Sequence, residues 1–379
     1  MKFVIAPDSF KGGLTAKQAA IAIQNGIARV YPKADYTLVP MADGGEGTVQ
    51  ALVDATNGKL ITEKVTGPLG DPVEATFGIL GDHKTAVIEM SQASGIQFIN
   101  QNTQNPLITT TYGTGELILK ALDYHISKLI IGIGGSATND GGAGMAQAIG
   151  VHLLDNKHHE IGRGGEALKH LAQIDMTDID PRLAKVQLLI ASDVTNPLVG
   201  PKGASVVFGP QKGATPAMIR ILDESLTHYA EIIKRDLNQD LANYPGAGAA
   251  GGLGAGLLAF TNASIKKGID IVTEYSGLKE QAQGANFVFT GEGGVDYQTK
   301  FGKTPYGVAL ATKSVAASAP VIVITGNIGE GIDELYSDKA IDAVFSSVSG
   351  VKTLEQVLID APHDIAQVAE NIARLINKF

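Results

Sequence analysis

Cysteine is absent from the 379-residue chain, which excludes disulfide bonds, catalytic thiolates and zinc sites built from thiolate ligands. The 8 histidines are scattered outside the glycine-rich loops and form no His-Glu-x-x-His motif. The Gly-x-Ser-x-Gly elbow of many hydrolases is missing as well. A chain without cysteine fits a reducing compartment, and we expect the protein to be cytoplasmic.

Long hydrophobic runs and an excess of positive charge are also missing. The first apolar run ends at Asp8, too early for a signal peptide. The longest weakly polar stretch, 245–260, is broken by glycines and is shorter than the roughly 20 residues that a membrane-spanning helix needs. The formal net charge is −9, which argues against binding to nucleic acid or to an anionic membrane surface. We therefore expect neither as a partner.

Short apolar runs alternate with helical patterns at both ends of the chain, which predicts an α/β fold with a doubly wound parallel sheet. We expect a capping box at Thr15 and Gln18, and a helix that starts at 304–305 with threonine as the cap and proline in the first turn. Two helices are expected near 354–360 and 362–378. The strands expected in this sheet lie at 2–6, 36–40, 286–289, 320–324 and 343–347.

The middle of the chain lacks this regular alternation. It has short expected strands and turns at 60–90 and two glycine-rich stretches further on. A length of 379 residues also suggests two domains rather than one. We expect residues 1–63 and 284–379 to form one discontinuous domain, and residues 64–283 to form an inserted second α/β domain.

Carboxylates, glycines and lysines gather in the loops that follow the expected strands. Ligands of open parallel sheets bind outside the carboxyl ends of the strands. Glycine amides can hold phosphate oxygens, carboxylates can hold Mg²⁺, and lysine can neutralise a transferred phosphoryl group, so this combination favours phosphoryl transfer. The residues concerned are Asp8, Lys11, Asp43, Glu46, Ser136, Thr138, Asn139, Asp140, Asp193, Asn196, Glu292 and Asp296.

Two glycine motifs have alternative interpretations. The segment 132–137 has the spacing of a dinucleotide-binding fingerprint, with Asp155 downstream, but 139–142 interrupts the helix that should follow. A plain strand-to-helix turn and a phosphate site are both open here. The segment 302–304 resembles the end of a P-loop, yet Tyr297 stands where the motif requires glycine, so it is not a Walker A sequence.

Other candidates also have a structural interpretation beside the functional one. The tract 246–256 fits either an anion-binding loop or close helix packing that requires small residues. Asp43 and Asp140 are each at a spacing that suits helix capping, whereas Asp8, Asp193, Glu292 and Asp296 have no evident following helix to cap. These four therefore carry more weight as functional residues.

The loops together resemble those of the bacterial type-1 glycerate kinase family along nearly the whole chain. The matching segments are APDSFKG at 6–12, MADGGEGT at 41–48, GIGGSATNDGGAGM at 132–145, ASDVTNPL at 191–198, FGPQKGA at 208–214, the tract 245–256, and TGEG at 290–293 with Asp296, Gln298 and Thr299. Two positions depart from the family pattern: Gly13 replaces a usual serine, and Gly294 replaces a usual arginine.

The resemblance implies a flavodoxin-like domain built from both chain ends, an inserted second α/β domain, and transfer of the ATP γ-phosphate to D-glycerate at its 2-hydroxyl. ATP and Mg²⁺ are the implied cofactors, and a monomer or a homodimer is expected. A kinase for a related small hydroxy acid, an NAD-dependent hydroxy-acid dehydrogenase and a non-catalytic small-acid binding protein remain as alternatives.

Residue type and strand-end position suggest individual roles. We expect Asp193 to be the base for the substrate hydroxyl, with Asp296 second, and Lys11 to contact the transferred phosphoryl group. Asp43 and Glu292 are the expected Mg²⁺ residues. The residues expected to bind substrate or nucleotide are Asp8, Ser9, Gly134, Gly135, Ser136, Asn139, Lys212, Gly291 and Lys303.

Overall fold

A computed structural model describes residues 1–378 and divides the chain into two compact units. The terminal unit consists of Met1–Gly58 and Lys267–Phe379, and the middle unit is Lys59–Lys266. Both boundaries lie earlier than the sequence suggested: they fall after residues 58 and 266, whereas residues 63 and 283 were expected. Residues 59–63 belong to a strand of the middle unit, and the helices between 267 and 283 pack against the terminal unit.

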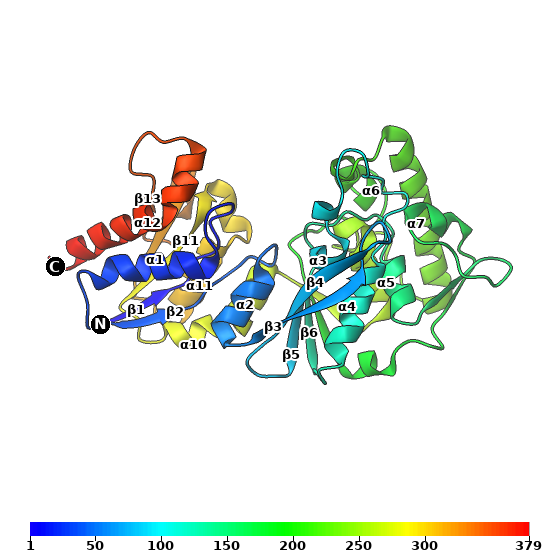
Figure 1. The fold of residues 1–379 in the computed structure, drawn as a ribbon, viewed down its shortest axis with the longest axis horizontal. Helices are drawn as coiled ribbons and strands as arrows, with labels where there is room; N and C mark the ends of the chain where they lie inside the picture. The colour runs from blue at the N-terminus through cyan, green and yellow to red at the C-terminus, as the bar shows by residue number, and fades with distance from the viewer. Residues whose placement is uncertain (379) are drawn as a thin grey trace. The chain divides into compact units, whose positions relative to one another are not determined.

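The terminal unit contains a five-stranded sheet in which every strand is parallel to its neighbours (Figure 1). The order is β13-β12-β11-β1-β2, which reads 2-1-3-4-5 when these strands are numbered along the chain. This is the flavodoxin-like order, and it confirms the expected doubly wound sheet. The strands are β1 (Lys2–Ile5), β2 (Asp35–Leu38), β11 (Phe287–Val295), β12 (Val321–Ile328) and β13 (Ala343–Ser346).

Helices cover both faces of this sheet (Figure 1). Alternate apolar residues of β1, including Phe3 and Ile5, form a buried core with α1 and α12, in which Ile23 and Ile365 are fully buried. The other face carries α9, α10 and α11, which pack against one another. The helices of this unit are α1 (Ala16–Ala28), α2 (Thr48–Thr56), α9 (Gly268–Tyr275), α10 (Leu278–Ala282), α11 (Thr304–Val315) and α12 (Leu354–Ile376).

Two helix predictions need correction, whereas the Thr15–Gln18 capping box is present as expected. The segment expected to hold two helices is the single helix α12, which continues through Pro362. Burial of the face that packs on α1 outweighs the backbone hydrogen bond that proline removes. Helix α11 has Lys303 as its N-cap, so Thr304 is its first residue, and the Thr304 hydroxyl donates to the Asp8 carboxylate instead of capping the helix.

The middle unit has a six-stranded sheet in the order β10-β9-β6-β5-β4-β3. β10, β9, β6 and β5 are parallel, and β4 and β3 extend the sheet as antiparallel strands. Its strands are β3 (Lys59–Thr66), β4 (Pro72–Ile79), β5 (Thr85–Glu89), β6 (Lys128–Gly132), β9 (Gln187–Ala191) and β10 (Ala263–Lys266), with a separate antiparallel pair β7 (His152–Leu154) and β8 (Gln173–Asp175). Its helices are α3 (Ser91–Ser94), α4 (Tyr112–Leu122), α5 (Ala143–Ala148), α6 (Ala204–Phe208), α7 (Pro216–Leu237) and α8 (Leu253–Phe260).

The glycine-rich tract 246–256 serves close packing. A side chain at Gly251 would place its Cβ 2.0 Å from the Thr138 carbonyl oxygen, and one at Gly256 would lie 2.6 Å from the Gly141 carbonyl oxygen. These glycines let α8 and the turn before it contact the backbone of the loop that follows β6. The packing interpretation of this tract therefore explains its composition.

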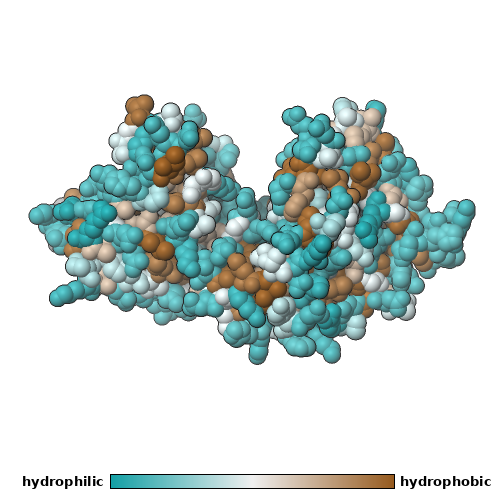
Figure 2. Space-filling model, viewed as in Figure 1, coloured by the Kyte–Doolittle hydropathy of each residue, from teal (hydrophilic) through white to brown (hydrophobic). Residues whose placement is uncertain are grey.

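Hydrophilic side chains cover most of the face drawn in Figure 2, and hydrophobic ones occur there in small groups. Among residues 1–378, no helix has the length and apolar content needed to cross a bilayer.

Contact between α1 and α12 makes Gly26 sensitive to substitution. An added Cβ would lie 2.1 Å from the Ala366 carbonyl oxygen. We expect Gly26→Ala to lower the free energy of unfolding of the terminal unit by about 1–3 kcal/mol, because the strain of overpacking exceeds the gain in helix propensity. Urea denaturation followed by circular dichroism would measure this loss. Asn25→Ala, an exposed change in the same helix, should be neutral or stabilising, and equal stability of the two variants would contradict this account.

Candidate active site

Three carboxylates meet at the carboxyl edge of the terminal-unit sheet. Asp8 follows β1, Asp43 follows β2, and Glu292 lies on β11, where it is the register partner of Thr325 on β12. β1 and β11 are the adjacent strands at which the strand order reverses. Crevices at such switch points are where open parallel sheets bind ligands.

Asp8 is a buried acid with an unusual protonation equilibrium. Burial raises the pKa of Asp8 to about 6, and the Asp43 charge adds to the increase, while the hydrogen bond from Thr304 opposes it. The Asp8 Oδ1 atom also accepts a hydrogen bond from the Ser9 backbone N–H. Asp8 thus titrates near neutral pH, as acid–base groups in catalytic sites do.

Glu292 also has a raised pKa. Burial raises the pKa of Glu292 to about 7, the charges of Asp8 and Asp43 add to the increase, and the nearby Lys303 and Lys11 oppose it. The Glu292 Oε1 atom is buried without a hydrogen-bond partner and lies 4.0 Å from the Lys303 Nζ atom. A buried carboxylate oxygen without a hydrogen-bond partner can accept a hydrogen bond or bind a cation.

These carboxylates are not a complete metal-binding set by themselves. Within residues 1–378, no three acidic, histidine or cysteine side chains are grouped closely enough to hold a metal ion. Mg²⁺ in phosphoryl-transfer sites usually takes only one or two carboxylates, with phosphate and water completing its shell. The unpaired Glu292 Oε1 atom and the neighbouring Asp43 charge fit that arrangement.

The loop after β11 brings Lys303 and Asp296 together. Their Nζ and Oδ1 atoms lie 3.8 Å apart. Asp296 also caps the 3-10 helix Tyr297–Phe301, because its side chain accepts a hydrogen bond from the Gln298 N–H at 2.9 Å. The expectation that Asp296 has no helix to cap was therefore wrong, and capping explains its presence without a catalytic role.

We call Asp8, Asp43 and Glu292 the acidic cluster. A cavity of 280 Å³ opens at Asp8. Four residues that the sequence selected, Asp8, Ser9, Lys11 and Glu46, line it together with Thr15. Two helices begin at this cavity, α1 after Thr15 and α2 after Gly47. Lys11 is exposed, and the second lysine of this cavity, Lys17, is paired with Asp54.

The middle unit gathers a second group of predicted residues at the carboxyl edge of its own sheet. Gly134, Gly135 and Ser136 follow β6, and Asp193 follows the adjacent β9, whose Ala191 is the register partner of Gly132. Asp193 is exposed. The expected placement of these residues at neighbouring strand ends is therefore observed within this unit.

Lys212 is almost completely buried, with 1% of its surface exposed. The Lys212 Nζ atom donates hydrogen bonds to the Ser136 hydroxyl at 2.9 Å and to the Thr138 carbonyl oxygen at 2.5 Å. Burial lowers the pKa of Lys212 to about 7, although the Asp140 charge opposes this effect. Lys212 thus holds the loop that follows β6, and contact with a substrate stays a prediction.

Asp140 and Asn139 belong to the same loop and differ in role. The buried Asp140 carboxylate accepts hydrogen bonds from Thr111, Gly142 and Gly144, so it organises the turn before α5, although Gly142 and not Asp140 is the N-cap of that helix. Burial is the largest influence on the pKa of Asp140 and raises it. Asn139 donates to the Ser205 hydroxyl at 2.9 Å, but its Oδ1 atom is buried without a partner.

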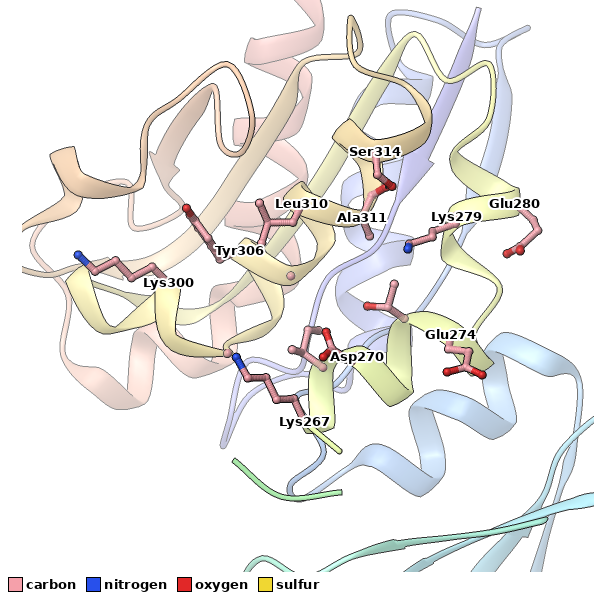
Figure 3. Close-up of a pocket in the computed structure, with 14 residues that line it drawn as sticks. Lys267, Asp270, Glu274, Lys279, Glu280, Lys300, Tyr306, Leu310, Ala311 and Ser314 are labelled. Carbon is pink, nitrogen blue, oxygen red and sulfur yellow. The ribbon is translucent and has the colours of Figure 1, made fainter. Parts of the chain in front are cut away.

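The structure also shows features that the sequence did not reveal. Thr304 binds Asp8 across a long sequence separation, and a cavity of 550 Å³ lies along α9 and α11 (Figure 3). None of the residues selected from sequence lines this larger cavity. Its only local hint was Gly302, within the segment that resembles a P-loop.

Comparison with known proteins agrees with this arrangement. The family model described as "Glycerate kinase family" matches residues 3–377. The chain belongs to the glycerate kinase family. It is 54% identical to the glycerate kinase of Bacillus subtilis, covering 99% of this chain and 98% of that protein. It is 50% identical to the glycerate 2-kinase of Escherichia coli, covering 98% of this chain and 97% of that protein.

A solved structure assigned as glycerate kinase 2 from Salmonella typhimurium LT2 has a TM-score of 0.92 and 48% identity, covering 100% of this chain and 98% of the other. These matches confirm the resemblance to glycerate kinases seen in the loop motifs. They give no support to the dehydrogenase alternative. The structure argues against it too, because α5 begins only at Ala143, so no helix starts at the glycines of 132–137.

The two departures from the glycerate kinase pattern differ in the space around them. A Cβ at Gly294 would meet its nearest atom, on Asn327, at 3.7 Å, which is an ordinary contact. A Cβ at Gly13 would lie 3.3 Å from a side-chain carbon of Leu358, which is tight. The backbone at Gly294 thus has room for a Cβ, whereas a side chain at Gly13 would require Leu358 to shift.

Burial of Lys212 should make stability depend on pH. The folded state favours neutral Lys212, so it binds fewer protons than the unfolded chain between pH 7 and about 10. We expect the free energy of unfolding to rise over this range by about 1–4 kcal/mol more in the native protein than in Lys212→Met. Urea denaturation at pH 7 and pH 9.5 would test this.

Lys202→Met is a control for that experiment, because it removes an exposed lysine from the same unit. The control should keep the native pH dependence. An unchanged pH dependence in Lys212→Met would contradict the inferred state of the buried lysine.

Proposed function

We propose that this protein transfers the γ-phosphoryl group of ATP to the 2-hydroxyl of D-glycerate and releases 2-phospho-D-glycerate. Family membership supports glycerate as the acceptor, and the relative named glycerate 2-kinase supports the 2-position. The observation that carries the proposal is the buried, unpaired Glu292 carboxylate oxygen beside Asp8 and Asp43 at the switch point of a parallel sheet.

Glu292 and Asp43 are the residues proposed to hold Mg²⁺, directly or through water. Mg²⁺ bound there would neutralise charge on the nucleotide phosphates during transfer. Lys303 lies between Glu292 and Asp296 and is suited to stabilise phosphate charge from the same side. Lys11, on the wall of the 280 Å³ cavity, is proposed to contact the transferred phosphoryl group.

The base that receives the hydroxyl proton is proposed to be Asp193, as the sequence indicated. The structure adds Asp8 as a second candidate, because its pKa of about 6 lies near the working pH and it lines the 280 Å³ cavity. Asp296 ranks below both, because its carboxylate already caps a 3-10 helix. Ser9, Gly291 and the loop 134–139 with Lys212 stay proposed as substrate or nucleotide contacts.

A cytoplasmic location and a monomeric or dimeric state are kept as predictions. No further function is proposed, because no described feature favours reduction of a nicotinamide or binding without turnover.

The activity can be measured as ADP release from ATP and Mg²⁺. We expect release to depend on D-glycerate and to be much weaker with L-glycerate, glycolate or no acid. Added enolase should convert the product, because enolase acts on 2-phosphoglycerate. ADP release without an enolase signal would move the phosphate to the other hydroxyl or change the acceptor. No ADP release from folded protein would contradict the proposal.

Two substitutions separate the candidate bases. If Asp193 is the base, Asp193→Asn should lower kcat by a factor of about 10² or more, because general base catalysis contributes that much. Asp8→Asn should then retain a larger kcat, since its amide oxygen can still accept the Thr304 hydrogen bond. A change confined to KM in Asp193→Asn would exclude Asp193, and a kcat loss confined to Asp8→Asn would assign the role to Asp8.

A further inference from the structure

The larger cavity of the terminal unit is a groove along α9 and α11 (Figure 3). Its volume of 550 Å³ falls within the range of about 300–1,000 Å³ that is typical of small-molecule sites. The two helices pack closely at Gly307, where a Cβ would lie 2.0 Å from a side-chain carbon of Ile269. Glycine at this position therefore sets the floor of the groove.

One end of the groove adjoins the acidic cluster through two backbone connections. Lys267 and Gly302 both line the groove. Residue Gly268, next to Lys267, contacts the backbone of the Asp43–Gly44 turn so closely that a Cβ would be 1.9 Å from the Asp43 carbonyl oxygen. Lys303, next to Gly302, lies 4.0 Å from Glu292. This end of the groove thus adjoins Lys303 and Glu292, the residues proposed to lie near the nucleotide phosphates.

The chemistry of the groove differs along its walls. Leu310, which is 47% exposed, supplies most of the apolar surface, whereas Ile269 and Ala311 also line the groove but are only 4% and 6% exposed. The rim is polar and charged, with Asp270 on α9 and Ser314 at the far end of α11; Glu274, Lys279, Glu280 and Lys300 also line the groove. Figure 3 shows the Lys267 side chain extending from the start of α9 toward the turn before α11. In the described part of the chain, Lys267 has no ion-pair partner.

We propose that this groove binds the nucleoside part of the nucleotide substrate. A planar base needs an apolar surface, ribose hydroxyls need polar partners such as a carboxylate, and the attached phosphates need a cation at the end nearest the acidic cluster. The groove offers an apolar wall at Leu310, a carboxylate at Asp270, and a cation, Lys267, at the end nearest the acidic cluster. Glycerate is small, anionic and without apolar surface, so the separate 280 Å³ cavity with Ser9 and Lys11 suits it better.

This proposal deepens the proposed function and rests on it for the identity of the nucleotide. The absence of cysteine allows a direct test, because Leu310→Cys would carry a single thiol inside the groove. Leu375→Cys is a matched control, since Leu375 is also an exposed leucine, 58% accessible, on α12, which packs against the other face of the same sheet.

The experiment measures the rate at which a maleimide labels each thiol. The Kd of ADP is first determined by calorimetry on the native protein. At an ADP concentration tenfold above that Kd, we expect the labelling rate of Leu310→Cys to fall about tenfold, because only about one-tenth of the protein remains free. ATP and AMP should protect as well, whereas inorganic tripolyphosphate and D-glycerate should not. Leu375→Cys should be labelled at the same rate throughout.

The outcomes separate the groove from the proposed activity. ADP binding without protection of Leu310→Cys would overturn the groove assignment and leave the kinase proposal intact. Protection by tripolyphosphate alone would also overturn it, since the groove would then hold phosphates. Protection by ADP without glycerate-dependent ADP release would support the groove and count against the kinase. If Leu310→Cys fails to bind ADP, Ser314→Cys provides the same measurement at the far end of the groove.

Discussion

Burial of two carboxylates beside a third at one sheet edge is the constraint on which the site depends. Asp8 and Glu292 are largely removed from water, and Asp43 adds a third charge close to both. The nearby Lys303 and Lys11 oppose this effect without cancelling it, because burial keeps the pKa of Glu292 at about 7. Without a ligand, the raised pKa values keep these carboxyl groups partly protonated near neutral pH. A bound cation would stabilise their ionised forms.

The sheet order explains why these groups meet. In the order 2-1-3-4-5, β1 and β11 are neighbours although their register partners Phe3 and Phe287 are far apart in the sequence. Backbone contacts then fix the loops that carry the charges. Gly291 allows β11 to approach β12, because a Cβ there would lie 1.9 Å from the Ile324 carbonyl oxygen. The Thr304 hydroxyl attaches the first turn of α11 to Asp8.

Local patterns in the sequence predicted most of this architecture. The parallel strands, the Thr15 capping box and the strand-end position of Asp8, Asp43 and Asp193 all follow from short-range periodicity and residue type. The loop motifs, taken in their order along the chain, indicated the family, and the family match over residues 3–377 confirmed that resemblance. The individual roles of these residues stay predictions, because neither the fold nor the family match assigns them.

Features that depend on long-range packing were not predictable in this way. Pro362 resembles a helix end locally, yet burial against α1 keeps α12 continuous. Lys212 has no local sign of burial, and only the fold places its amine against Ser136 and Thr138. The groove arises because Gly307 meets Ile269, two residues whose contact no spacing rule would reveal.

Calorimetric titration with Mg²⁺ at pH 7, in two buffers of different ionisation enthalpy, tests the central claim most directly. If the acidic cluster receives the cation, Mg²⁺ should lower the pKa of Glu292 and Asp8, and binding should release protons to the buffer. Glu292→Gln should weaken binding and reduce this release, whereas Glu330→Gln, an exposed change in the same unit, should alter neither. Equal Mg²⁺ binding by the native protein and Glu292→Gln, with no proton release, would contradict the account.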